Sequence, residues 1–371
     1  MRDIPVADPG ASYRAHMGQI DEAVGRVLKS GWYIMGREVQ AFEEAFASFL
    51  GASHCTSTGS GTDALVLILR ALGIGPGDAV VTVSHTAVAT VAAIDLVGAC
   101  PVLVDVDPVS FTMSTEHLAA TLGAWSGAPI RAIIPVHLYG QPAELGPIME
   151  LAARYGAWVI EDCAQAHGAT YRGRPVGTIG IAGVFSFYPT KNLGAFGDGG
   201  AVITSDSGLA QQCALVKQYG WRTRYVSEIP GMNTRLDEVQ AAILRVKLEH
   251  LPGGNARRQA IASAYQNVSI GGVAHPGRLL DREHVFHQYV VQAEERDRLR
   301  SHLSAQKVGT AVLYPVPVHK QPGYAGRVKV GPGGLPATES ICKRILSLPI
   351  YPEMTADDIS QVISALSSFS V

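Results

Sequence analysis

The sequence lacks the like-charge blocks and long apolar runs that mark nucleic-acid-binding and membrane-spanning proteins. Its 371 residues carry 30 Lys+Arg against 32 Asp+Glu, with no basic block or arginine-rich helix. We therefore expect no nucleic-acid partner. The most apolar window, "AVATVAAIDLVGACPVLV", contains Asp95, Gly98 and Pro101. It predicts a buried helix followed by a strand rather than a membrane span, so no membrane partner is expected.

Paired cysteines and metal-binding motifs are also missing. The five cysteines show no CxxC spacing and their number is odd, which is typical of a reduced cytoplasm. The N-terminal stretch "MRDIPVADPGASYRAHMGQ" has no apolar signal region, so we expect a cytoplasmic protein. There is no HExxH motif, and His284 and His287 lie in a strand-like run where they would face opposite sides. No metal site is expected.

What the chain does contain is material for a large α/β core. Hydrophobic residues make up 47% and charged residues 17% of the sequence. Short β-rich runs alternate with helical patterns, which predicts βαβ units and a mainly parallel sheet covered on both faces. The predicted strands are 79–84, 100–107, 131–138 and 157–163, and the predicted helices are 62–72, 87–97, 115–122 and 143–155. The runs "GVFSFY" and "GAVITS" predict two further strands close together.

The domain organisation follows from one boundary signal. The amphipathic segment 236–251 is followed by "PGGN", where we expect the helix to end, and the composition changes after it. We predict a large α/β domain with an N-terminal arm at 1–250. A smaller α+β domain is predicted at 251–371, with a strand in "HQYVVQA" and a helix at 296–306.

Three polar motifs lie where predicted strands end. They are "TGSGTDAL" (58–65), "EDCAQAHGA" (161–169) and the glycine-rich lysine loop in "FSFYPTKNLGAFGDGGAV" (185–202). Ligands of open α/β sheets bind beyond the carboxyl ends of the strands. We therefore expect these motifs to form one site.

The first motif is a glycine-bearing turn that enters a helix. Ser60, Gly61 and Thr62 would present backbone N–H groups to an anion, assisted by the helix dipole. Taken alone the signal is weak, because Thr62 is equally suited to cap the helix.

The second motif places a carboxylate where little water is expected. Asp162 follows the apolar run "AWVI", and a buried carboxylate is costly unless a cation or several hydrogen bonds compensate it. A structural ion pair or a helix cap would satisfy it, and so would the ring nitrogen of a pyridinium.

The third motif places one amine among aromatic residues and glycines. Most lysines are solvated surface charges, but a desolvated lysine such as Lys191 can lose its proton and attack a carbonyl. Ser186, five residues earlier, is a candidate phosphate donor, or an ordinary strand-edge serine bonded to backbone.

Together these groups match the needs of pyridoxal 5'-phosphate (PLP) and its amine form (PMP). Lys191 would hold the cofactor as an imine and then move protons, while Asp162 would keep the ring nitrogen protonated. The spacing alone does not separate transamination from other pyridoxal chemistry.

The three stretches "EDCAQAHGA", "FSFYPTKNLGAFGDGGAV" and "GMNTRLDEVQAAILRVKLEHL" resemble the DegT-type nucleotide-sugar aminotransferases. The similarity runs from "GWYIMGREVQAFEEAFA" through "LSLPIYPEM", almost the whole chain. It implies a PLP-dependent transferase of fold type I, with a mainly parallel mixed sheet between helices and a smaller C-terminal α+β domain. It also implies a homodimer whose active site is shared between subunits.

The resemblance also assigns roles to individual residues. Lys191 and Asp162 would be the catalytic pair, and Gln165 would bond the cofactor's phenolic oxygen. Ser186, with the Ser60–Thr62 turn, would hold the phosphate. Asn233 would reach the phosphate from the neighbouring subunit; without the resemblance it is an ordinary turn residue before a helix.

The segment "LYPVPVHKQPGY" (313–324) narrows the match. It is similar to the branch of the family that makes 3-amino-3,6-dideoxyhexoses, where relatives read His-Tyr-Pro-Val-Pro-Val-His. Tyr314 and His319 would then lie at the substrate mouth, or else form a proline-stiffened connector. Leu313 replaces the usual histidine, which weakens the substrate assignment.

Other positions depart from the family pattern or stay open. Relatives carry an aromatic residue at position 87 to stack on the cofactor ring, but this chain has Ala87. His85 would take over the stacking, or it is a core or capping histidine. Tyr188 and His167 are candidates for the sugar pocket, with core packing as the alternative for each. Gly254 stands where relatives often have tryptophan.

We therefore expect a PLP-dependent aminotransferase that moves an amino group from an amino acid, L-glutamate by resemblance, to a keto group of a nucleotide-linked keto-6-deoxyhexose. The keto sugar is expected to be a dTDP-3-keto-6-deoxyhexose made for amino-sugar biosynthesis. Amination at C4 is one alternative, and a non-catalytic PLP-binding regulator is another. A dehydratase of the same fold is disfavoured, because such relatives replace the lysine with histidine. The sequence does not fix the base, the sugar stereochemistry or the pathway.

Overall fold

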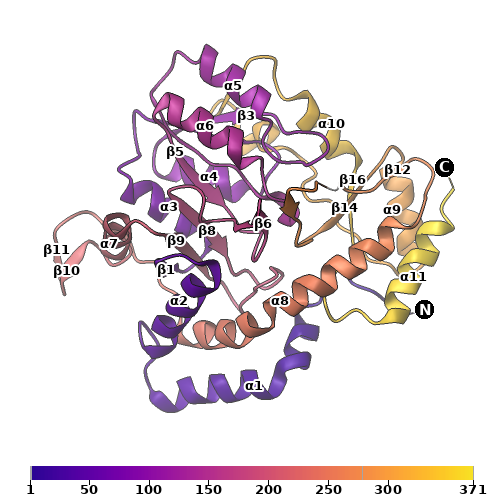
Figure 1. The fold of residues 1–371 in the computed structure, drawn as a ribbon, viewed down its shortest axis with the longest axis horizontal. Helices are drawn as coiled ribbons and strands as arrows, with labels where there is room; N and C mark the ends of the chain where they lie inside the picture. Colours follow the sequence, from indigo (N-terminus) through magenta and orange to yellow (C-terminus); the bar gives the residue numbers. More distant parts are fainter. Residues whose placement is uncertain (1, 278, 371) are drawn as a thin grey trace.

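A mixed sheet of eight strands organises most of the computed structural model, which describes residues 2–277 and 279–370 (Figure 1). The strand order is β1-β9-β8-β5-β4-β2-β3-β15. The strands are β1 (His54–Thr58), β2 (Ala79–Val83), β3 (Cys100–Val104), β4 (Ile130–Ile133), β5 (Trp158–Asp162), β8 (Ala182–Ser186), β9 (Gly200–Thr204) and β15 (Lys329–Val330). Only the pairs β8–β9 and β1–β9 are antiparallel. The prediction of a mainly parallel α/β fold is confirmed.

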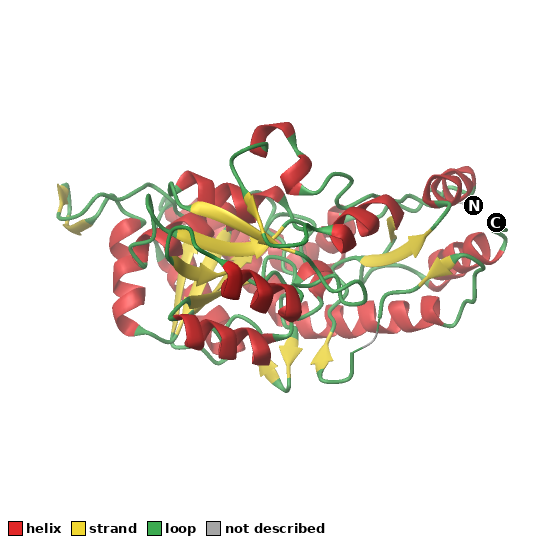
Figure 2. Cartoon of the chain, turned by 90° about the horizontal axis from the view of Figure 1, so that it is seen from above, coloured by secondary structure: helices red, strands yellow, loops and turns green. Residues whose placement is uncertain are grey.

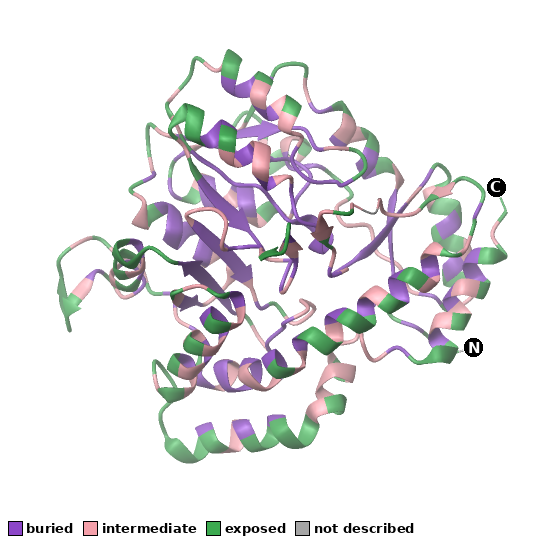
Figure 3. Ribbon diagram, in the orientation of Figure 1, coloured by how far each residue is buried: buried purple, intermediate pink, exposed green. Residues whose placement is uncertain are grey.

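Helices cover both faces of this sheet, as its sequence requires. Neighbouring residues of one strand enter different cores: Val80 packs with α3, α4 and α7, whereas Val81 packs with α5 and α6 on the other face. Because both faces are buried, the strands are apolar runs instead of alternating ones (Figure 3). The helices are α3 (Gly61–Ala71), α4 (Val88–Leu96), α5 (Thr115–Ala124), α6 (Leu145–Tyr155) and α7 (Ser207–Val216).

The long helix α8 (Glu238–Gln266) corrects one prediction. The helix does not end at "PGGN" but continues through Pro252 for 29 residues in all. Its first half packs on the large core through Leu244 and Leu248, and its second half packs on the C-terminal core through Ile261 and Tyr265. Packing along both halves outweighs the cost of a proline inside the helix.

The C-terminal part forms its own layer around a second core. A three-stranded antiparallel sheet, β12 (Val273–Ala274), β14 (Tyr289–Ala293) and β16 (Ile345–Leu348), packs against α9 (Arg296–Ala305) and α11 (Ala356–Ser367). The predicted division at 250/251 stays a prediction. Two features cross it: α8 itself, and β15, which pairs with β3 in the large sheet.

The remaining elements surround these two parts. They are α1 (Pro9–Ser30), α2 (Arg37–Leu50), α10 (Pro336–Arg344), β6 (Thr170–Tyr171), β7 (Arg174–Pro175), β10 (Trp221–Thr223), β11 (Val226–Ser227), β13 (Arg282–Glu283), η1 (Leu138–Gly140), η2 (Val318–Lys320) and η3 (Pro322–Tyr324). The β10–β11 hairpin projects from one end of the molecule (Figure 2). Within the described residues, no helix combines the length and apolarity needed to cross a membrane.

The start of α2 depends on a carboxylate from another helix. Its N-cap residue, Gly36, has no side chain to accept a hydrogen bond. Glu238, the first residue of α8, accepts the backbone N–H groups of Gly36 (2.7 Å), Glu38 (2.9 Å) and Val39 (3.0 Å). This buried carboxylate therefore ties the N-terminal helices to α8.

We predict that Glu238→Ala lowers the free energy of unfolding by about 2 kcal/mol, because it leaves three N–H groups of α2 without their acceptor. Chemical denaturation measures the change. The matched control is Glu249→Ala on the exposed face of the same helix. Equal loss of stability in the two variants would contradict the cross-helix cap.

Candidate active site

The site lies at the edge of the large sheet where the parallel strands end. Asp162 is the last residue of β5, Ser186 is the last residue of β8, and the turn before α3 follows β1. Because β1 and β8 both pair antiparallel with β9, they run in the same direction and end at the same edge. The three predicted motifs are thus brought to one edge of the sheet.

Asp162 is a buried carboxylate with an incomplete set of partners. Its Oδ2 accepts a hydrogen bond from the Thr90 hydroxyl (2.8 Å) and its Oδ1 accepts one from the backbone N–H of Ala164 (3.1 Å). Burial raises the pKa of Asp162, while the Thr90 and Ala164 hydrogen bonds and the charge of Lys191 oppose the rise. In the described part of the chain no cationic side chain lies within 4 Å of it. The position is suited to a cationic ligand atom.

Lys191 supplies an amine near enough to that carboxylate for the two charges to interact. Its backbone N–H donates to the carbonyl of Tyr188 (2.8 Å), which fixes the loop in a tight turn. Burial lowers the pKa of the Lys191 amine to about 8, and the negative charge of Asp162 opposes the shift. Among the described residues, the amine has no hydrogen-bond or ion-pair partner. The neutral, nucleophilic form of the amine is therefore far more populated near neutral pH than it is in a solvated lysine.

The lysine loop needs glycine where its backbone folds on itself. A Cβ at Gly194 would lie 2.4 Å from the carbonyl oxygen of Pro189, which no side chain tolerates. The next residue, Ala195, donates its N–H to the carbonyl of Phe187 (2.7 Å) and closes the loop.

The turn at the start of α3, Ser60, Gly61 and Thr62, lies against Ser186 at the end of β8, and we call these four residues the cradle. Ser60 is the N-cap, and its hydroxyl accepts from the N–H of Asp63 (3.0 Å), so Thr62 lies in the first turn and is not the cap. A Cβ at Gly61 would lie 2.7 Å from Cβ of Ser186. Glycine at this position therefore lets the β8 end, with the Ser186 hydroxyl, approach the helix N-terminus.

Gln165 and Tyr314 meet beside Asp162. The Gln165 side-chain oxygen accepts the N–H of Tyr139 (2.7 Å), and its amide nitrogen donates to the hydroxyl of Tyr314 (3.1 Å). Burial raises the pKa of Tyr314 to about 12; the Gln165 hydrogen bond lowers it and the charge of Asp162 raises it. The 313–324 segment, distant in sequence, therefore reaches the site through Tyr314.

His319 lies further from the reactive groups. Its ring bonds the Ser84 hydroxyl through Nδ1 (2.8 Å) and Glu339 through Nε2 (3.2 Å). These contacts hold the connector to the end of β2. They agree with the alternative in which the 313–324 segment is a proline-stiffened connector. The substrate role of His319 stays a prediction.

His85 has the contacts of a core histidine. Its Nε2 bonds the hydroxyl of Tyr139 (2.9 Å), its Nδ1 lies 3.5 Å from the sulfur of Cys342, and burial lowers its pKa to about 4. Phe111 and Tyr139 pack edge-on against the ring. These contacts favour the core alternative over stacking on a cofactor ring.

The two candidates for the sugar pocket differ in exposure. His167 is fully buried between Phe185 and Phe187, both ring nitrogens lack a partner among the described residues, and burial lowers its pKa to about 3. Tyr188 is 52% exposed on the lysine loop. Exposure leaves Tyr188 free to meet a ligand, whereas His167 packs in the core.

Asn233 lies near the cradle of its own chain. It pairs with Gln218 through an isolated β-bridge. The next residue, Thr234, bonds the carboxylate of Asp63 (2.8 Å) and the N–H of Gly59 (2.8 Å). The segment is therefore anchored beside the α3 N-terminus, and its reach into a second subunit stays a prediction.

Two residues around Asp162, Thr90 and Glu161, were not predicted from the sequence. Thr90 lies on the first turn of α4, and only its contact identifies it, because a helical threonine carries no signal by itself. Glu161 accepts N–H groups from Gly177 (2.7 Å), Ile179 (2.7 Å) and Gly180 (2.8 Å). The sequence did contain a signal for Glu161, because two adjacent acids, Glu161 and Asp162, stand at the end of an apolar strand.

Glu161, His137 and Cys163 offer ligand atoms within 4.8 Å of one another, a spacing that a metal ion could use. The carboxylate already accepts three N–H groups and bonds His137 (3.1 Å). Burial alone would raise the pKa of Glu161, but the His137, Gly177 and Gly180 hydrogen bonds outweigh it and lower the pKa. The cluster is thus accounted for as a structural network.

The donor set fits PLP in three independent respects. The glycine-lined cradle at α3 suits a phosphate, the buried Asp162 lacks a cation, and the Lys191 amine suits an aldehyde. Together they can hold an anionic aldehyde whose ring carries a positive charge.

Comparison with known proteins agrees with this geometry. The model of the DegT/DnrJ/EryC1/StrS aminotransferase family matches residues 15–367. The dTDP-3-amino-3,4,6-trideoxy-alpha-D-glucose transaminase of Streptomyces venezuelae is 44% identical over 98% of this chain and 95% of its own length.

Two solved structures extend the comparison. The X-ray structure of S. venezuelae DesV has a TM-score of 0.94 at 44% identity and covers 99% of this chain and 98% of that chain. Bacillus subtilis NtdA, solved with bound cofactor PMP, has a TM-score of 0.88 at 29% identity over 99% and 85% of the two chains.

We predict that Asp162→Asn lowers the pKa of Lys191 below its value of about 8, because the substitution removes the negative charge that favours the protonated amine. The pH dependence of Lys191 labelling by an amine-reactive reagent, read by mass spectrometry on cofactor-free protein, measures it. Labelling of exposed Lys29 in the same samples is the control. A midpoint that stays in place or rises would show that the two groups do not interact.

Proposed function

The chain belongs to the DegT/DnrJ/EryC1/StrS aminotransferase family, and we propose that it aminates the C3 keto group of a dTDP-linked keto-6-deoxyhexose. It is a PLP-dependent nucleotide-sugar aminotransferase for amino-sugar biosynthesis. The observation that carries the proposal is the meeting of Lys191, Asp162 and the α3 cradle at one sheet edge.

The residues of the site divide the work of holding the cofactor. Ser60, Gly61 and Thr62 at the α3 N-terminus, with Ser186, would hold the phosphate. Asp162, positioned by Thr90, would bond the ring nitrogen and keep it protonated. When bound, the cofactor supplies an aldehyde that takes up the amino group and a ring that accepts electrons from the adjacent carbon.

Lys191 has two roles in the proposal. Its Nζ would be the attachment point for the aldehyde, and as a free amine it would accept and return a proton at the donor α-carbon. Because burial brings its pKa to about 8, the freed amine can both accept and give up a proton near neutral pH. Gln165 would bond the phenolic oxygen, in exchange for its present hydrogen bond to Tyr314.

The substrate assignment is supported by Tyr314 and by the relatives. Tyr314 brings the "LYPVPVH" segment into the site, and Tyr188 is exposed at the lysine loop. A relative that matches 98% of the chain carries the name of a dTDP-3-amino sugar transaminase. L-Glutamate is the proposed amino donor.

We also propose a cytoplasmic homodimer whose subunits share the active site, with Asn233 reaching the partner's cradle. Within its own chain, Thr234 anchors the Asn233 segment beside the α3 N-terminus through Gly59 and Asp63. The proposed dimer would be two-fold symmetric, so each subunit would offer its Asn233 to the other. A holoprotein that sediments as a monomer would overturn the shared site.

We predict that the PMP form of the protein transfers its amino group fastest to a dTDP-3-keto-6-deoxyhexose within a panel of nucleotide keto-sugars. Stopped-flow absorbance follows the return of the aldehyde form. In the same assay Lys191→Ala should be slower by at least ~10³-fold, because the proton-transfer group is lost. Lys29→Ala, on the exposed face of α1, is the matched control.

Preference for the 4-keto isomer would reassign the position of amination and leave the reaction class intact. Full activity of Lys191→Ala would overturn the reaction class itself.

A further inference from the structure

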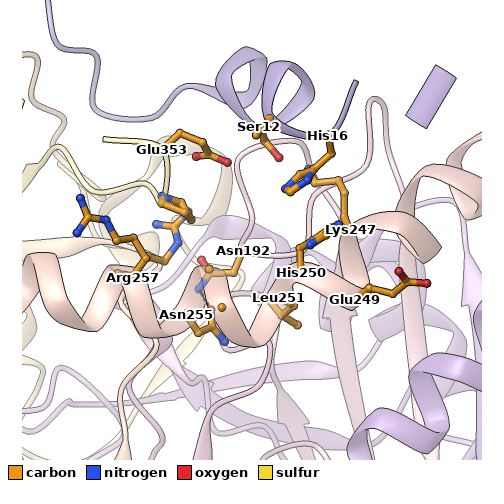
Figure 4. Close-up of a pocket in the computed structure, with 15 residues that line it drawn as sticks. Ser12, His16, Asn192, Lys247, Glu249, His250, Leu251, Asn255, Arg257 and Glu353 are labelled. Carbon is orange, nitrogen blue, oxygen red and sulfur yellow. Dashed lines mark hydrogen bonds between the residues drawn. The ribbon is translucent and has the colours of Figure 1, made fainter. Parts of the chain in front are cut away.

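A cavity of about 390 Å³ lies between the N-terminal half of α1 and the middle of α8 (Figure 4). Ser12 and His16 line it from α1, Lys247 lines it from α8, and Glu353 lines it from the loop after β16. The cavity takes in none of the cradle residues. Its volume is in the range of small-molecule sites.

Two buried cations line this cavity without an acidic partner. Lys247 is 7% exposed and Arg258 is 6% exposed. Within the part of the chain that the structure describes, neither has a carboxylate oxygen within 4 Å. Buried charges without a counter-ion are costly, so an anionic ligand would stabilise this arrangement.

Both cations also keep unused donors. Arg258 spends Nη1 on the carbonyls of Ile350 (2.6 Å) and Phe286 (3.3 Å), and no acceptor among the described residues takes its Nε and Nη2 groups. The Lys247 amine donates to the carbonyl of Gly194 (2.5 Å) and keeps further donors. Burial lowers the pKa of Lys247 to about 8 and that of Arg258 to about 10, against the raising effect of Glu353.

The side chains that line the larger cavity carry charges of both signs. Glu353 and Ser12 lie at the same side of the cavity, and Glu353 has no ion-pair partner among the residues described. Glu353, with Glu249, would repel a phosphate, which is acceptor-rich and fully anionic. A ligand with a carboxylate at one end and an ammonium group at the other can pair with both the cations, Lys247 and Arg258, and the carboxylate of Glu353.

The cavity adjoins the lysine loop. A smaller cavity of about 50 Å³ shares Ser12, Lys247, Arg258 and Glu353 with it and is lined by Lys191 as well. Asn192, the residue after the lysine, lines both cavities, and its side-chain Nδ2 donates a hydrogen bond to Oδ1 of Asn255 on α8 (2.9 Å). A ligand in the larger cavity would therefore sit next to the reactive amine without occupying the cofactor cradle.

We propose that this cavity binds an α-amino acid, with its carboxylate on Lys247 and Arg258 and its ammonium group on Glu353. The proposal rests on the proposed function only for the choice of L-glutamate as the probe. Such a site would hold an amino acid beside the lysine loop.

The test is calorimetric titration of L-glutamate into the PMP form, with which an amino-acid donor does not react. We expect saturable binding that Gly254→Trp weakens at least about tenfold by filling the cavity. A Cβ at Gly254 would meet only Pro352, at 3.4 Å, so the larger side chain can enter the space. Gly18→Trp, at an exposed position of α1 with no atom within 4 Å, is the matched control.

Glu353→Gln separates the ammonium contact from the carboxylate contact. It should weaken L-glutamate about tenfold and leave 2-oxoglutarate, which lacks the ammonium group, unchanged or tighter. Absence of saturable binding, unchanged affinity in Gly254→Trp, or equally tight binding of inorganic phosphate would each overturn the proposal. Because the titration involves no turnover, a failure of transamination would count against the proposed function and not against this site.

Discussion

The site depends on the electrostatic coupling of a buried carboxylate and a desolvated amine. Burial pushes the pKa of Asp162 up and that of Lys191 down, so both charged forms are disfavoured, and each charge partly offsets the effect on the other. Neither group is fully compensated by the protein alone. A ligand that brings a positive ring next to the carboxylate and an aldehyde next to the amine would satisfy both groups at once.

The fold builds this imbalance by ordinary means. Parallel strands deliver Asp162 and Ser186 to one edge, and their buried faces exclude water from it. Glu161, the neighbour of Asp162 in β5, bonds His137 and accepts the N–H groups of the 177–180 turn before β8, and Thr90 fixes one oxygen of Asp162. The sheet and these hydrogen bonds fix the positions of Asp162 and Ser186. The glycines of the loops allow the backbone to approach closely at the site.

The sheet and its motifs were predictable because their signals are local. Apolar runs of strand length and glycine-bearing turns identify strand ends, and Asp162, Lys191 and Ser60 follow directly from them. The end of α8 was not predictable from Pro252 and its glycines, since contacts with two separate cores decide whether the helix continues. Thr90 and Tyr139 were missed for the same reason: they act through contacts between segments distant in sequence.

The central claim, that the Lys191 amine is where PLP becomes attached, is tested most directly by chemical trapping. The holoprotein is reduced with borohydride, digested and mapped by mass spectrometry, with exposed lysines such as Lys29 as internal references. We expect the phosphopyridoxyl mass on the peptide that contains Lys191 and on none of the others. Modification of a different lysine in the cofactor-saturated protein, with Lys191 unmodified, would contradict it.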